Sequence, residues 1–405
     1  MSKIRVLLLR SCRGITDITG AETYLLNLLS AFDRERCDPH LVCITDPRMG
    51  ETAWLHELKV RGIAYETIPV SNPASISDLL ALPALIKRSN AQIVHSIDHR
   101  ADIVGVVSAK VTGRASVASF FGWTNWEARS PRARFYPLVD RWAMRYLDVL
   151  ITDSRPMRAQ IARKGSRPPT IVIPNGVDAV KFDSEKVEPL PGQRFFPGSG
   201  HFYIGMIGRI HPNKGQLDFV KAALSIHADH PQCRFLIIGD APAGFEAYRA
   251  EVQQFIRTHG MEDYCLITNV KSAEIPRLIA RLDVLAAPSY MESFSFTLLE
   301  AMSMARPILT TNVGGNADMI EDGKSGLLVE PGRIDAIVET LDALCRNADL
   351  RNSLGSHARS RIEKYFSAEV MAERTMSLYE TVMEHRRAHP GGRISVRELE
   401  NSTLK

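Results

Sequence analysis

The stretch DVLAAPSYMESFSFTLLEAMSMARPILTTNVGGNADMI, residues 283–320, decides most about the fold. Its pattern predicts a buried strand, a polar loop, a helix over 296–305, a second strand and a Gly-Gly turn that opens another helix. Elsewhere, short runs rich in Val, Ile and Leu alternate with longer helical patterns, which is typical of βαβ units around a parallel sheet. The sequence therefore predicts the α/β class, and its 405 residues favour two domains over a single core.

The expected organisation is two Rossmann-like αβα domains that face a cleft. The segment 184–200 is rich in Pro, Gly and charge, as linkers often are. We therefore expect a first domain over 1–188, a second over 189–366, a helix over 367–388 that crosses back to the first domain, and a flexible tail over 389–405.

Two glutamates flank the start of the helix predicted over 296–305. Glu292 lies in the preceding loop and Glu300 lies within the helix. Ligands of open α/β sheets bind at the carboxyl ends of strands, and a helix N-terminus attracts phosphate. Carboxylates there can accept hydrogen bonds from sugar or ribose hydroxyls, so the pattern suits a nucleotide sugar. The alternative is a solvated helix face with a capping role.

The second informative stretch is YIGMIGRIHPNKGQLDFVKAA, residues 203–223, in which a predicted strand ends at Gly208. The loop that follows carries Arg209 and Lys214. A planar guanidinium and a compact ammonium suit a diphosphate, and glycine lets the backbone approach a ligand closely. The alternative is a surface loop with two ordinary cations.

The first predicted strand is followed by RSCRGITDITGAETYLLNLL, in which Gly20 precedes a helix led by Glu22. This glycine-containing loop is placed to face the same ligand as the loops of the second domain. The sequence contains neither a GxGxxG fingerprint nor a P-loop pattern, which argues against dinucleotide or ATP binding.

Basic residues are concentrated in residues 129–167, which carry a net charge of +7 in a chain of net charge +4. Aromatic residues such as Trp142 and Tyr146 alternate with these arginines, and such a surface can dock on anionic lipid headgroups. The alternative is a solvated helix face whose aromatic side chains point into the core. Nucleic acid is disfavoured because no recognised binding module accompanies the charge.

The six cysteines show no metal-binding spacing and predict reduced thiols of a cytoplasmic protein. No apolar run of the sequence approaches the length of a membrane span. We therefore expect a cytoplasmic protein that the basic stretch could bring to the inner face of the membrane.

Taken together, these residues resemble the retaining glycosyltransferases of the GT-B fold, in the "group 1" or glycosyltransferase family 4 type. The resemblance covers most of the chain and is strongest over 171–332. Glu292 and Glu300 match the family's E-x7-E motif, and Arg209 and Lys214 match its diphosphate site. The other matching segments are VIPNGVD at 172–178, VGG at 313–315, DGKSGLLVEPG at 322–332, and Gly-Ala-Glu at 20–22 in place of the family's Gly-Gly loop.

The resemblance implies a role for each of these residues. Glu292 would contact hydroxyls of the transferred sugar, Glu300 those of the ribose, and Arg209 and Lys214 would neutralise the leaving diphosphate. The first domain would hold the acceptor, a glycan or lipid-linked precursor, and the second a UDP- or GDP-sugar, with no cofactor and no metal. Further donor contacts are implied for Gly20, Gly208, Asn269, Val270, and the backbone of Phe294, Ser295 and Phe296.

The chain also departs from the family pattern. Many relatives carry His-Gly where this chain has Phe121-Gly122, and phenylalanine cannot hydrogen-bond a sugar hydroxyl. His95 and His99 are the nearest candidates to replace that contact, although a histidine at the end of a buried strand is often structural. Ser293-Phe294-Ser295 stands in place of the common Gly-Phe-Gly.

Two other functions remain open at this point. One is a nucleotide-sugar epimerase of the same fold, and the other is a non-catalytic partner subunit that binds a sugar nucleotide. A nicotinamide-dependent oxidoreductase ranks last because the glycine fingerprint is absent.

Overall fold

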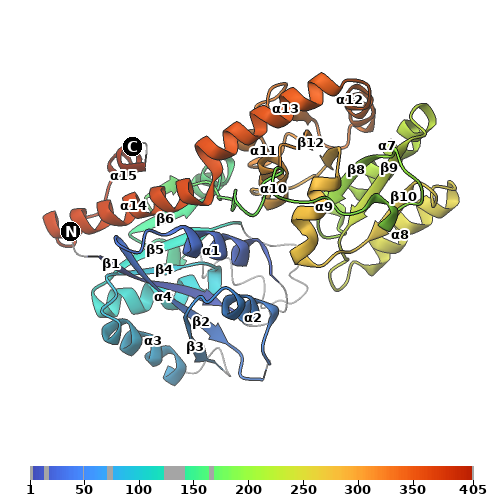
Figure 1. The fold of residues 1–405 in the computed structure, drawn as a ribbon. Coiled ribbons are helices and arrows are strands. Elements are labelled where there is room, and N and C mark those ends of the chain that lie inside the picture. Colours follow the sequence, from blue (N-terminus) through green and yellow to red (C-terminus); the bar gives the residue numbers. More distant parts are fainter. Residues whose placement is uncertain are drawn as a thin grey trace. The chain divides into compact units, whose positions relative to one another are not determined.

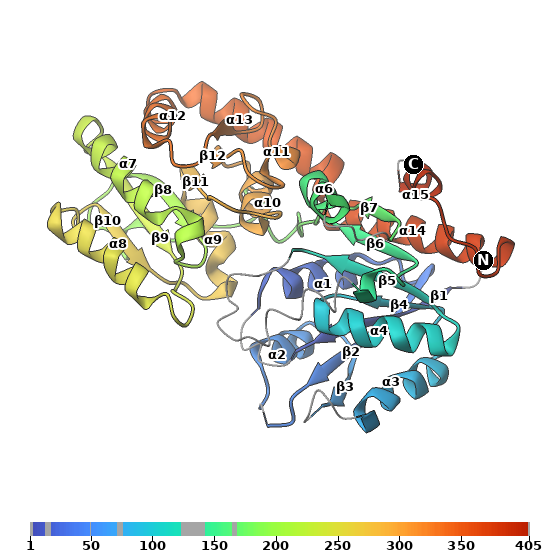
Figure 2. The same ribbon diagram turned by 180° about the vertical axis from the view of Figure 1, so that it is seen from behind.

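The computed structural model describes residues 3–12, 18–48, 50–70, 76–122, 142–163 and 168–403. The chain forms two compact units, of which the first contains Met1–Gly176 with Ala368–Lys405 and the second contains Val177–Ser367. Each unit has a parallel sheet with helices in front of it and behind it, as the opposite views in Figures 1 and 2 show. The predicted α/β class with two Rossmann-like domains is confirmed.

The sheet of the first unit has the strand order β3-β2-β1-β4-β5-β6-β7 within the described residues. The strands β4, β5 and β6 are buried along their whole length, because helices cover both faces of the sheet. The strands are β1 Ile4–Ser11, β2 Cys37–Thr45, β3 Tyr65–Pro69, β4 Ile93–Ser96, β5 Ala115–Phe120, β6 Val149–Thr152 and β7 Thr170–Val172. The helices are α1 Gly20–Ala31, α2 Ala53–Val60, α3 Ile76–Arg88, α4 His99–Thr112, α6 Arg155–Arg163, α14 Ala368–Ala388 and α15 Val396–Thr403.

The sheet of the second unit has the order β10-β9-β8-β11-β12-β13. Along β9, Leu236 and Ile238 join one hydrophobic core and Phe235 and Ile237 join another, as the period of two in a strand requires. The strands are β8 Phe202–Ile207, β9 Cys233–Ile238, β10 Cys265–Thr268, β11 Val284–Ala287, β12 Ile308–Thr311 and β13 Leu327–Val329. The helices are α7 Gln216–Asp229, α8 Glu246–Thr258, α9 Ile275–Arg281, α10 Phe296–Ser303, α11 Asn316–Met319, α12 Ile334–Arg346 and α13 Ala348–Arg361, with 3-10 turns η1 Gly192–Arg194, η2 Pro212–Lys214 and η3 Ser272–Glu274 and the π-helical turn η4 Ile362–Phe366.

In both sheets the strand order reverses beside the first strand of the unit, so β1 lies between β2 and β4, and β8 lies between β9 and β11. Such a reversal opens a crevice at the carboxyl ends of the strands, where ligands of doubly wound folds bind. The fold therefore directs the search for a site to the ends of β1 and β8.

The division between the units differs from the expected one. It falls between Gly176 and Val177 rather than at 188/189, because the intervening segment packs on the second unit. Phe182 and Leu190 are buried in a core of that unit, and the Leu190 amide donates to the Arg277 carbonyl (3.0 Å). The region with linker-like composition is thus an integral part of the second unit.

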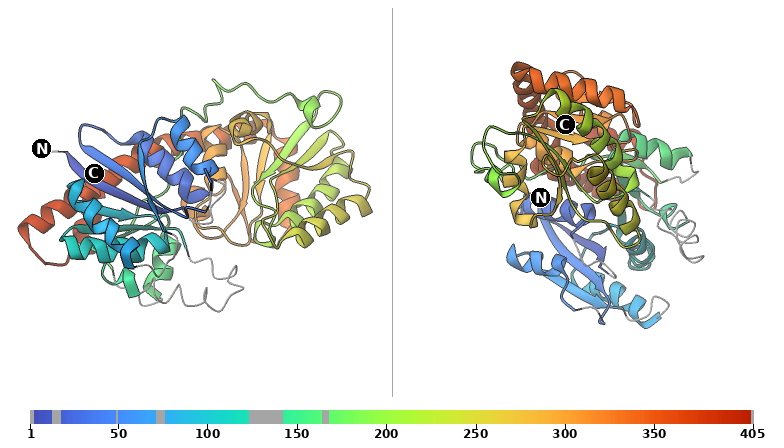
Figure 3. Two further views of the ribbon diagram at one scale, coloured as in Figure 1. Left: turned by 90° about the horizontal axis from the view of Figure 1, so that it is seen from below. Right: turned by 90° about the vertical axis from the view of Figure 1, so that its right-hand side faces the viewer.

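The C-terminal segment returns to the first unit, as predicted. Helix α14 runs alongside this unit (Figures 1 and 3) and is fastened by Arg36, which pairs with Glu373 (2.6 Å) and Glu380 (3.0 Å). The expectation of a flexible tail over 389–405 is wrong for Val396–Thr403, which form helix α15. Helix α15 packs on α14, and Leu399 is completely buried. None of the helices in the described ranges combines the length and the apolar character that crossing a bilayer would require.

Candidate active site

The loop between β11 and α10 carries Glu292 at the carboxyl edge of the second sheet. Three hydrogen bonds fix its backbone: the Tyr290 amide donates to Asn213 O (2.7 Å), the Gly315 amide to Ser293 O (2.8 Å), and the Thr311 hydroxyl to Ser289 O (2.5 Å). The loop is thereby tied to η2 on one side and to the turn after β12 on the other.

Two glycines allow this close packing. Gly215 has φ +78°, and a Cβ atom there would lie 2.1 Å from the Pro288 carbonyl oxygen. Gly314 has φ +51°, and a Cβ atom there would lie 1.6 Å from the carbonyl oxygen of Glu292. Any other residue at either position would push the Glu292 loop away from its neighbours, since both the left-handed backbone and the space favour glycine.

The structure brings two of the predicted site residues into direct contact. Lys214 Nζ lies 2.5 Å from Glu292 Oε2, and the two side chains keep 23% and 14% of their surface exposed. A pair that is largely shielded but still open to solvent can exchange partners with a ligand. The ammonium could then bind a phosphate, and the carboxylate could accept hydrogen bonds from hydroxyl groups.

Arg209 follows Gly208 directly after β8, and its side chain is exposed. Its charge and that of Lys214 act on the same neighbour, His211, which is buried. Burial, followed by these two positive charges, lowers the pKa of His211 to about 4. The ring is therefore neutral at physiological pH, and its Nδ1 accepts a hydrogen bond from the Asn213 amide (3.0 Å). Arg209 and Lys214 therefore lie near the same histidine in the loop after β8, and their assignment to a diphosphate stays a prediction.

Helix α10 begins at the end of the Glu292 loop. Ser295 caps it, because its hydroxyl oxygen accepts a hydrogen bond from the Leu298 amide (3.4 Å). The first turn contains no acidic residue, so no side chain of this turn neutralises the positive end of the helix dipole. The side chain of Phe294 packs against Phe366 in the core, with ring centroids 5.9 Å apart, so a role of Phe294 in binding would fall to its backbone. Phe296 is partly buried against the same core.

Glu300 lies one turn further along α10. Burial raises the pKa of its carboxyl to about 7, and the positive charge of Lys181 opposes that rise. A carboxyl group that titrates near neutrality can change its charge when a ligand binds. Lys181 was not predicted as a site residue. Its signal in the sequence is its place just after VIPNGVD, the segment that already matched the family.

The two residues predicted for the base pocket follow β10. Asn269 is exposed; its amide nitrogen donates to the Asp240 carboxylate, and its Oδ1 accepts from the Val270 amide (2.9 Å). Asp240 comes after β9, so the ends of two neighbouring strands meet here. Sequence reasoning missed Asp240, although an acidic residue two positions after a buried strand is a usable signal.

The corresponding edge of the first unit carries a buried ionic network. Arg10, at the end of β1, donates from Nε (2.7 Å) and Nη2 (2.5 Å) to Glu22 Oε1. Its Nη1 donates to Asp98 Oδ2 (2.8 Å) and to Ile97 O (2.9 Å). The other oxygen of Glu22 accepts from the Thr19 amide (3.0 Å). The start of α1 at Gly20 is therefore fixed by Arg10, which the sequence reasoning overlooked.

The histidine proposed to replace the family's sugar contact is not available. His95 is completely buried, with Nδ1 2.6 Å from the Tyr379 hydroxyl and Nε2 2.8 Å from the Ser119 hydroxyl. Burial lowers its pKa to about 3, so the ring stays neutral. The expectation of a substrate role for His95 is therefore wrong, and its role is to join β4 to α14.

The remaining candidates at this edge are only partly described. His99 begins α4, but its side chain lies outside the described residues. Phe121 packs edge-on against Tyr24, with ring centroids 5.0 Å apart, and Gly122 follows with φ +118°. Phe121 thus fills the position of the expected histidine with an apolar contact.

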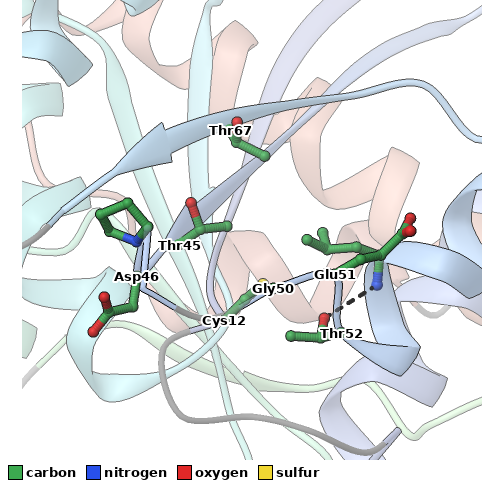
Figure 4. Close-up of a pocket in the computed structure, with 9 residues that line it drawn as sticks. Cys12, Thr45, Asp46, Gly50, Glu51, Thr52 and Thr67 are labelled. Carbon is green, nitrogen blue, oxygen red and sulfur yellow. Dashed lines mark hydrogen bonds between the residues drawn. The ribbon is translucent and has the colours of Figure 1, made fainter.

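A cavity of about 270 Å³ opens at the carboxyl ends of β1, β2 and β3 in the first unit. Figure 4 shows its threonines and acidic residues together with the thiol of Cys12. Thr52 caps α2 by accepting from the Leu55 amide (3.4 Å). The cavity is lined by Cys12, Thr45, Asp46, Pro47, Gly50, Glu51, Thr52, Leu55 and Thr67. Its hydroxyl and carboxylate groups suit a ligand that is rich in hydroxyls.

The basic stretch over 129–167 lies largely outside the described residues, because positions 123–141 and 164–167 are not described. Of its aromatic residues, Trp142 and Tyr146 are described, with 51% and 49% of their surface exposed and ring centroids 5.0 Å apart. These two rings therefore do not point into the core. Among the described residues, no three side chains of His, Cys, Asp or Glu gather as metal ligands would.

Comparisons with known proteins identify the family and the fold of the chain. The sequence model of the family described as "Glycosyl transferases group 1" matches residues 193–361, and that of "Glycosyltransferase Family 4" matches residues 18–181. The structure of Anabaena Alr3699/HepE in complex with UDP superposes with a TM-score of 0.79 at 20% identity, covering 94% of this chain and 100% of that chain.

Two relatives are similar over most of the chain. The capsular polysaccharide biosynthesis glycosyltransferase CapM of Staphylococcus aureus is 24% identical over 327 residues, which is 77% of this chain and 82% of that protein. The UDP-Gal:alpha-D-GlcNAc-diphosphoundecaprenol alpha-1,3-galactosyltransferase of Escherichia coli is 24% identical over 379 residues, which is 89% of this chain and 94% of that protein.

Proposed function

Since the chain belongs to the group 1 glycosyltransferases of the GT-B fold, we propose that it transfers a hexose-type sugar from a UDP- or GDP-sugar. The transfer retains the configuration at the anomeric carbon. The observation that carries this proposal is the contact between Lys214 and Glu292 at the start of α10. A cation suited to phosphate and a carboxylate suited to sugar hydroxyls meet at the carboxyl edge of the sheet, where ligands of doubly wound folds bind, which supports the proposal.

In the proposed reaction, the acceptor oxygen forms a bond to the anomeric carbon while the bond from that carbon to the diphosphate oxygen breaks. The departing phosphate oxygen takes the acceptor's proton on the same face of the sugar. No protein nucleophile is needed, so catalysis rests on positioning and on stabilising the leaving charge. Arg209, Lys214 and the N-terminus of α10 would supply that stabilisation without a divalent ion.

The two glutamates would divide the donor between them. Glu292, beside Lys214, would accept hydrogen bonds from the transferred sugar. Glu300, further along α10 and held partly protonated by burial, would accept from the ribose hydroxyls. Asn269 and Val270 would line the base pocket at the end of β10.

The acceptor would be a glycan or a lipid-linked precursor of a surface polysaccharide. The relatives' names support this, since one acts in capsule synthesis and another uses a diphosphoundecaprenol acceptor. The cavity at the ends of β1–β3 offers hydroxyls and carboxylates to the acceptor sugar. The exposed rings of Trp142 and Tyr146 within the basic stretch support docking of the protein at an anionic membrane surface.

A donor screen tests the proposal most directly. Each UDP- and GDP-sugar of a panel is added to the purified protein and the melting temperature is recorded, because a ligand that binds the folded state stabilises it. One base series should raise the melting temperature and the other should not. Proton NMR of the product then gives the anomeric configuration, and EDTA tests metal independence.

Four outcomes would overturn parts of the proposal. An inverted product would exclude retention, and activity lost in EDTA and restored by Mg²⁺ or Mn²⁺ would exclude the metal-free mechanism. Conversion of the donor sugar to its epimer without any acceptor would identify an epimerase. Binding without transfer or hydrolysis of any donor would identify a non-catalytic partner subunit.

A further inference from the structure

Two thiols face each other at the amino-terminal ends of the strands of the second sheet, whereas the candidate site lies at the carboxyl ends. Cys233 is the first residue of β9 and is completely buried, whereas Cys345 lies near the end of α12 and is partly exposed. Their Sγ atoms are 3.7 Å apart. The contact between His230 Nε2 and Asp342 Oδ1 (2.7 Å) fastens the same two chain segments, so the thiols are held together by their surroundings.

The surroundings of this pair are rich in arginine. Arg351 donates from Nη1 to the carbonyl oxygens of Leu344 (2.5 Å) and Cys345 (3.2 Å), which places its guanidinium beside the backbone of Cys345. Arg234 follows Cys233 directly and donates to its carbonyl oxygen (2.9 Å). Positive charge next to a partly exposed thiol favours the thiolate, which is the reactive form of cysteine.

The two sulfurs have different acidities. The hydrogen bond from the Cys233 thiol, and then the charge of Arg351, lower the pKa of Cys345 against the effects of burial and of the carboxylates of Asp342 and Asp283. The same hydrogen bond, together with burial, raises the pKa of Cys233. Cys345 is thus the sulfur that ionises first and that a small reagent can reach, and Cys233 is the protonated partner beneath it.

We propose that Cys345 and Cys233 form an oxidisable dithiol, a modification site at which hydrogen peroxide converts the two thiols into a disulfide. The Cys345 thiolate attacks the peroxide, its sulfur keeps one oxygen as a sulfenic acid, and the hydroxide that leaves takes up a proton to become water. The sulfur of Cys233 then attacks that of Cys345, loses its proton, and a second water leaves with the sulfenic oxygen. The two sulfurs are oxidised, and the peroxide is reduced to two waters.

The remaining distance is short. The sulfurs must approach from 3.7 Å to the S–S bond length of about 2.05 Å, and Cys345 lies in the last turn of α12, where a helix frays most readily. The disulfide would join residues 112 positions apart in the sequence. A cross-link of such span restricts the unfolded chain, so the oxidised protein should melt at a higher temperature than the reduced protein.

The test treats the reduced, full-length protein with hydrogen peroxide, blocks free thiols with iodoacetamide, and maps the peptides by mass spectrometry. We expect a peptide pair joined through Cys233 and Cys345 that is two hydrogens lighter than the reduced pair and is restored by dithiothreitol. With Cys233→Ser, dimedone should trap a sulfenic acid on Cys345. With Cys345→Ser, Cys233 should remain a free thiol at the same peroxide dose.

The four other cysteines supply an internal control, since Cys12, Cys37, Cys43 and Cys265 are all buried. A bond between Cys12 and Cys43, with Cys233 and Cys345 both alkylated, would overturn the proposal. So would a sulfenic acid on Cys345 of the wild-type protein that never resolves to a disulfide. The melting temperature of each reduced variant shows whether it is folded.

A charge variant tests whether Arg351 activates the Cys345 thiol or merely lies close to it. Arg351→Gln should slow disulfide formation by roughly two- to fivefold, the range for one charge interaction near a protein surface. Arg333→Gln, at the other end of α12, removes an exposed arginine that pairs with Asp335 and should leave the rate unchanged. Equal rates in wild type and in both variants would show that the arginine does not activate Cys345.

Discussion

The two units place a cation and a carboxylate at the same edge of their sheets, yet they bury them very differently. In the first unit the side chains of Arg10 and Glu22 are 7% and 0% exposed. In the second unit those of Lys214 and Glu292 are 23% and 14% exposed. A fully buried pair is committed to its partner, whereas a shielded but accessible pair can release its partner to a ligand. The same position in the fold thus serves as a structural clamp in one unit and as a candidate binding site in the other.

The residue types match these two uses. The guanidinium of Arg10 bonds in several directions at once and joins β1 to the starts of α1 and α4. The ammonium of Lys214 is a compact charge on a flexible stem that can turn from a carboxylate to a phosphate. Arginine is therefore suited to the closed network, and lysine to the open one.

The largest effect should come from breaking the closed pair. Arg10→Met leaves Glu22 buried without its counter-charge, which should lower the free energy of unfolding by about 3–5 kcal/mol. Lys214→Met, in the accessible pair, should lower it by about 1 kcal/mol or less. All four tryptophans precede residue 177, so tryptophan fluorescence during urea titration reports on the first unit. Circular dichroism covers both units.

A double variant shows whether the loss comes from the orphaned charge. Arg10→Met with Glu22→Leu removes both charges and should recover part of the stability lost in Arg10→Met alone, because no buried charge is left unpaired. If Arg10→Met and Lys214→Met cost the same, the distinction between a closed and an open pair is wrong.

The second effect concerns turnover. Arg209→Ala and Lys214→Ala should each lower kcat by about 10²–10³, the usual cost of losing one preorganised group that stabilises developing charge. Lys324→Ala is a matched control, because Lys324 forms an exposed pair with Glu321 on the same unit. Near-wild-type kcat in both site variants, with the control unchanged, would remove these residues from the site.

How far the sequence predicted these features differs between fold and site. The alternation of apolar strands with helices was enough for the two sheets, because a buried parallel strand must be a continuous apolar run. The boundary near 184–200 was misplaced because linker-like composition does not show whether Phe182 and Leu190 pack against a core. The tail was misjudged for the same reason, since its few apolar residues, of which Ile394 and Leu399 are buried, are scattered through a polar segment.

The candidate site was predicted in part. Lys214 and Glu292 were each identified from the pattern of their own segment, although the two residues lie 78 positions apart and only the structure shows their contact. Arg10 and Asp98 were missed because their partnership depends on the order of strands and is invisible in local sequence. For His95 the sequence left a substrate role and a structural role open, because only the fold shows that α14 supplies Tyr379 as its partner.

The third effect separates the two glutamates of the second unit. Glu300→Gln should weaken binding of free UDP or GDP, and Glu292→Gln should chiefly lower kcat, because the ribose is unchanged during transfer whereas the sugar develops charge. Each lost charge-assisted hydrogen bond should cost on the order of 1.5–3 kcal/mol. Isothermal calorimetry gives Kd, and steady-state assays give kcat. Wild-type affinity of the Glu300 variant for both nucleotides would refute its assignment to the ribose.

A smaller effect concerns pH. Burial raises the pKa of Glu300 to about 7 from its ordinary 4.5. Ionisation of this group therefore lowers the free energy of unfolding progressively as the pH rises between these two values. Above the higher value the loss stays constant. If the carboxylate accepts ribose hydroxyls, nucleotide binding should weaken roughly tenfold between about pH 8 and about pH 6. Glu300→Gln removes this component and leaves the titration of the phosphate as the baseline. The variant should also be more stable than wild type at about pH 8 while binding the nucleotide less tightly. Parallel pH profiles of wild type and variant would exclude this role.

The smallest effect concerns an exposed arginine of the first unit, in contrast to the buried Arg10. Arg145 is exposed beside Trp142 and Tyr146, whose rings are also half-exposed. An arginine near an anionic bilayer contributes about 1 kcal/mol, so neutralising it with Arg145→Gln should weaken binding to phosphatidylserine vesicles about fivefold. Binding to uncharged vesicles should not change.

Arg257→Gln, on α8 of the second unit, removes an exposed arginine outside the basic stretch and serves as the control. Added salt should reduce the difference between Arg145→Gln and wild type, because the interaction acts through solvent over a Debye length of about 10 Å. If vesicle binding ignores both the substitution and the salt, the exposed charges of the first unit have no role at the membrane. The rings of Trp142 and Tyr146 would then need another partner.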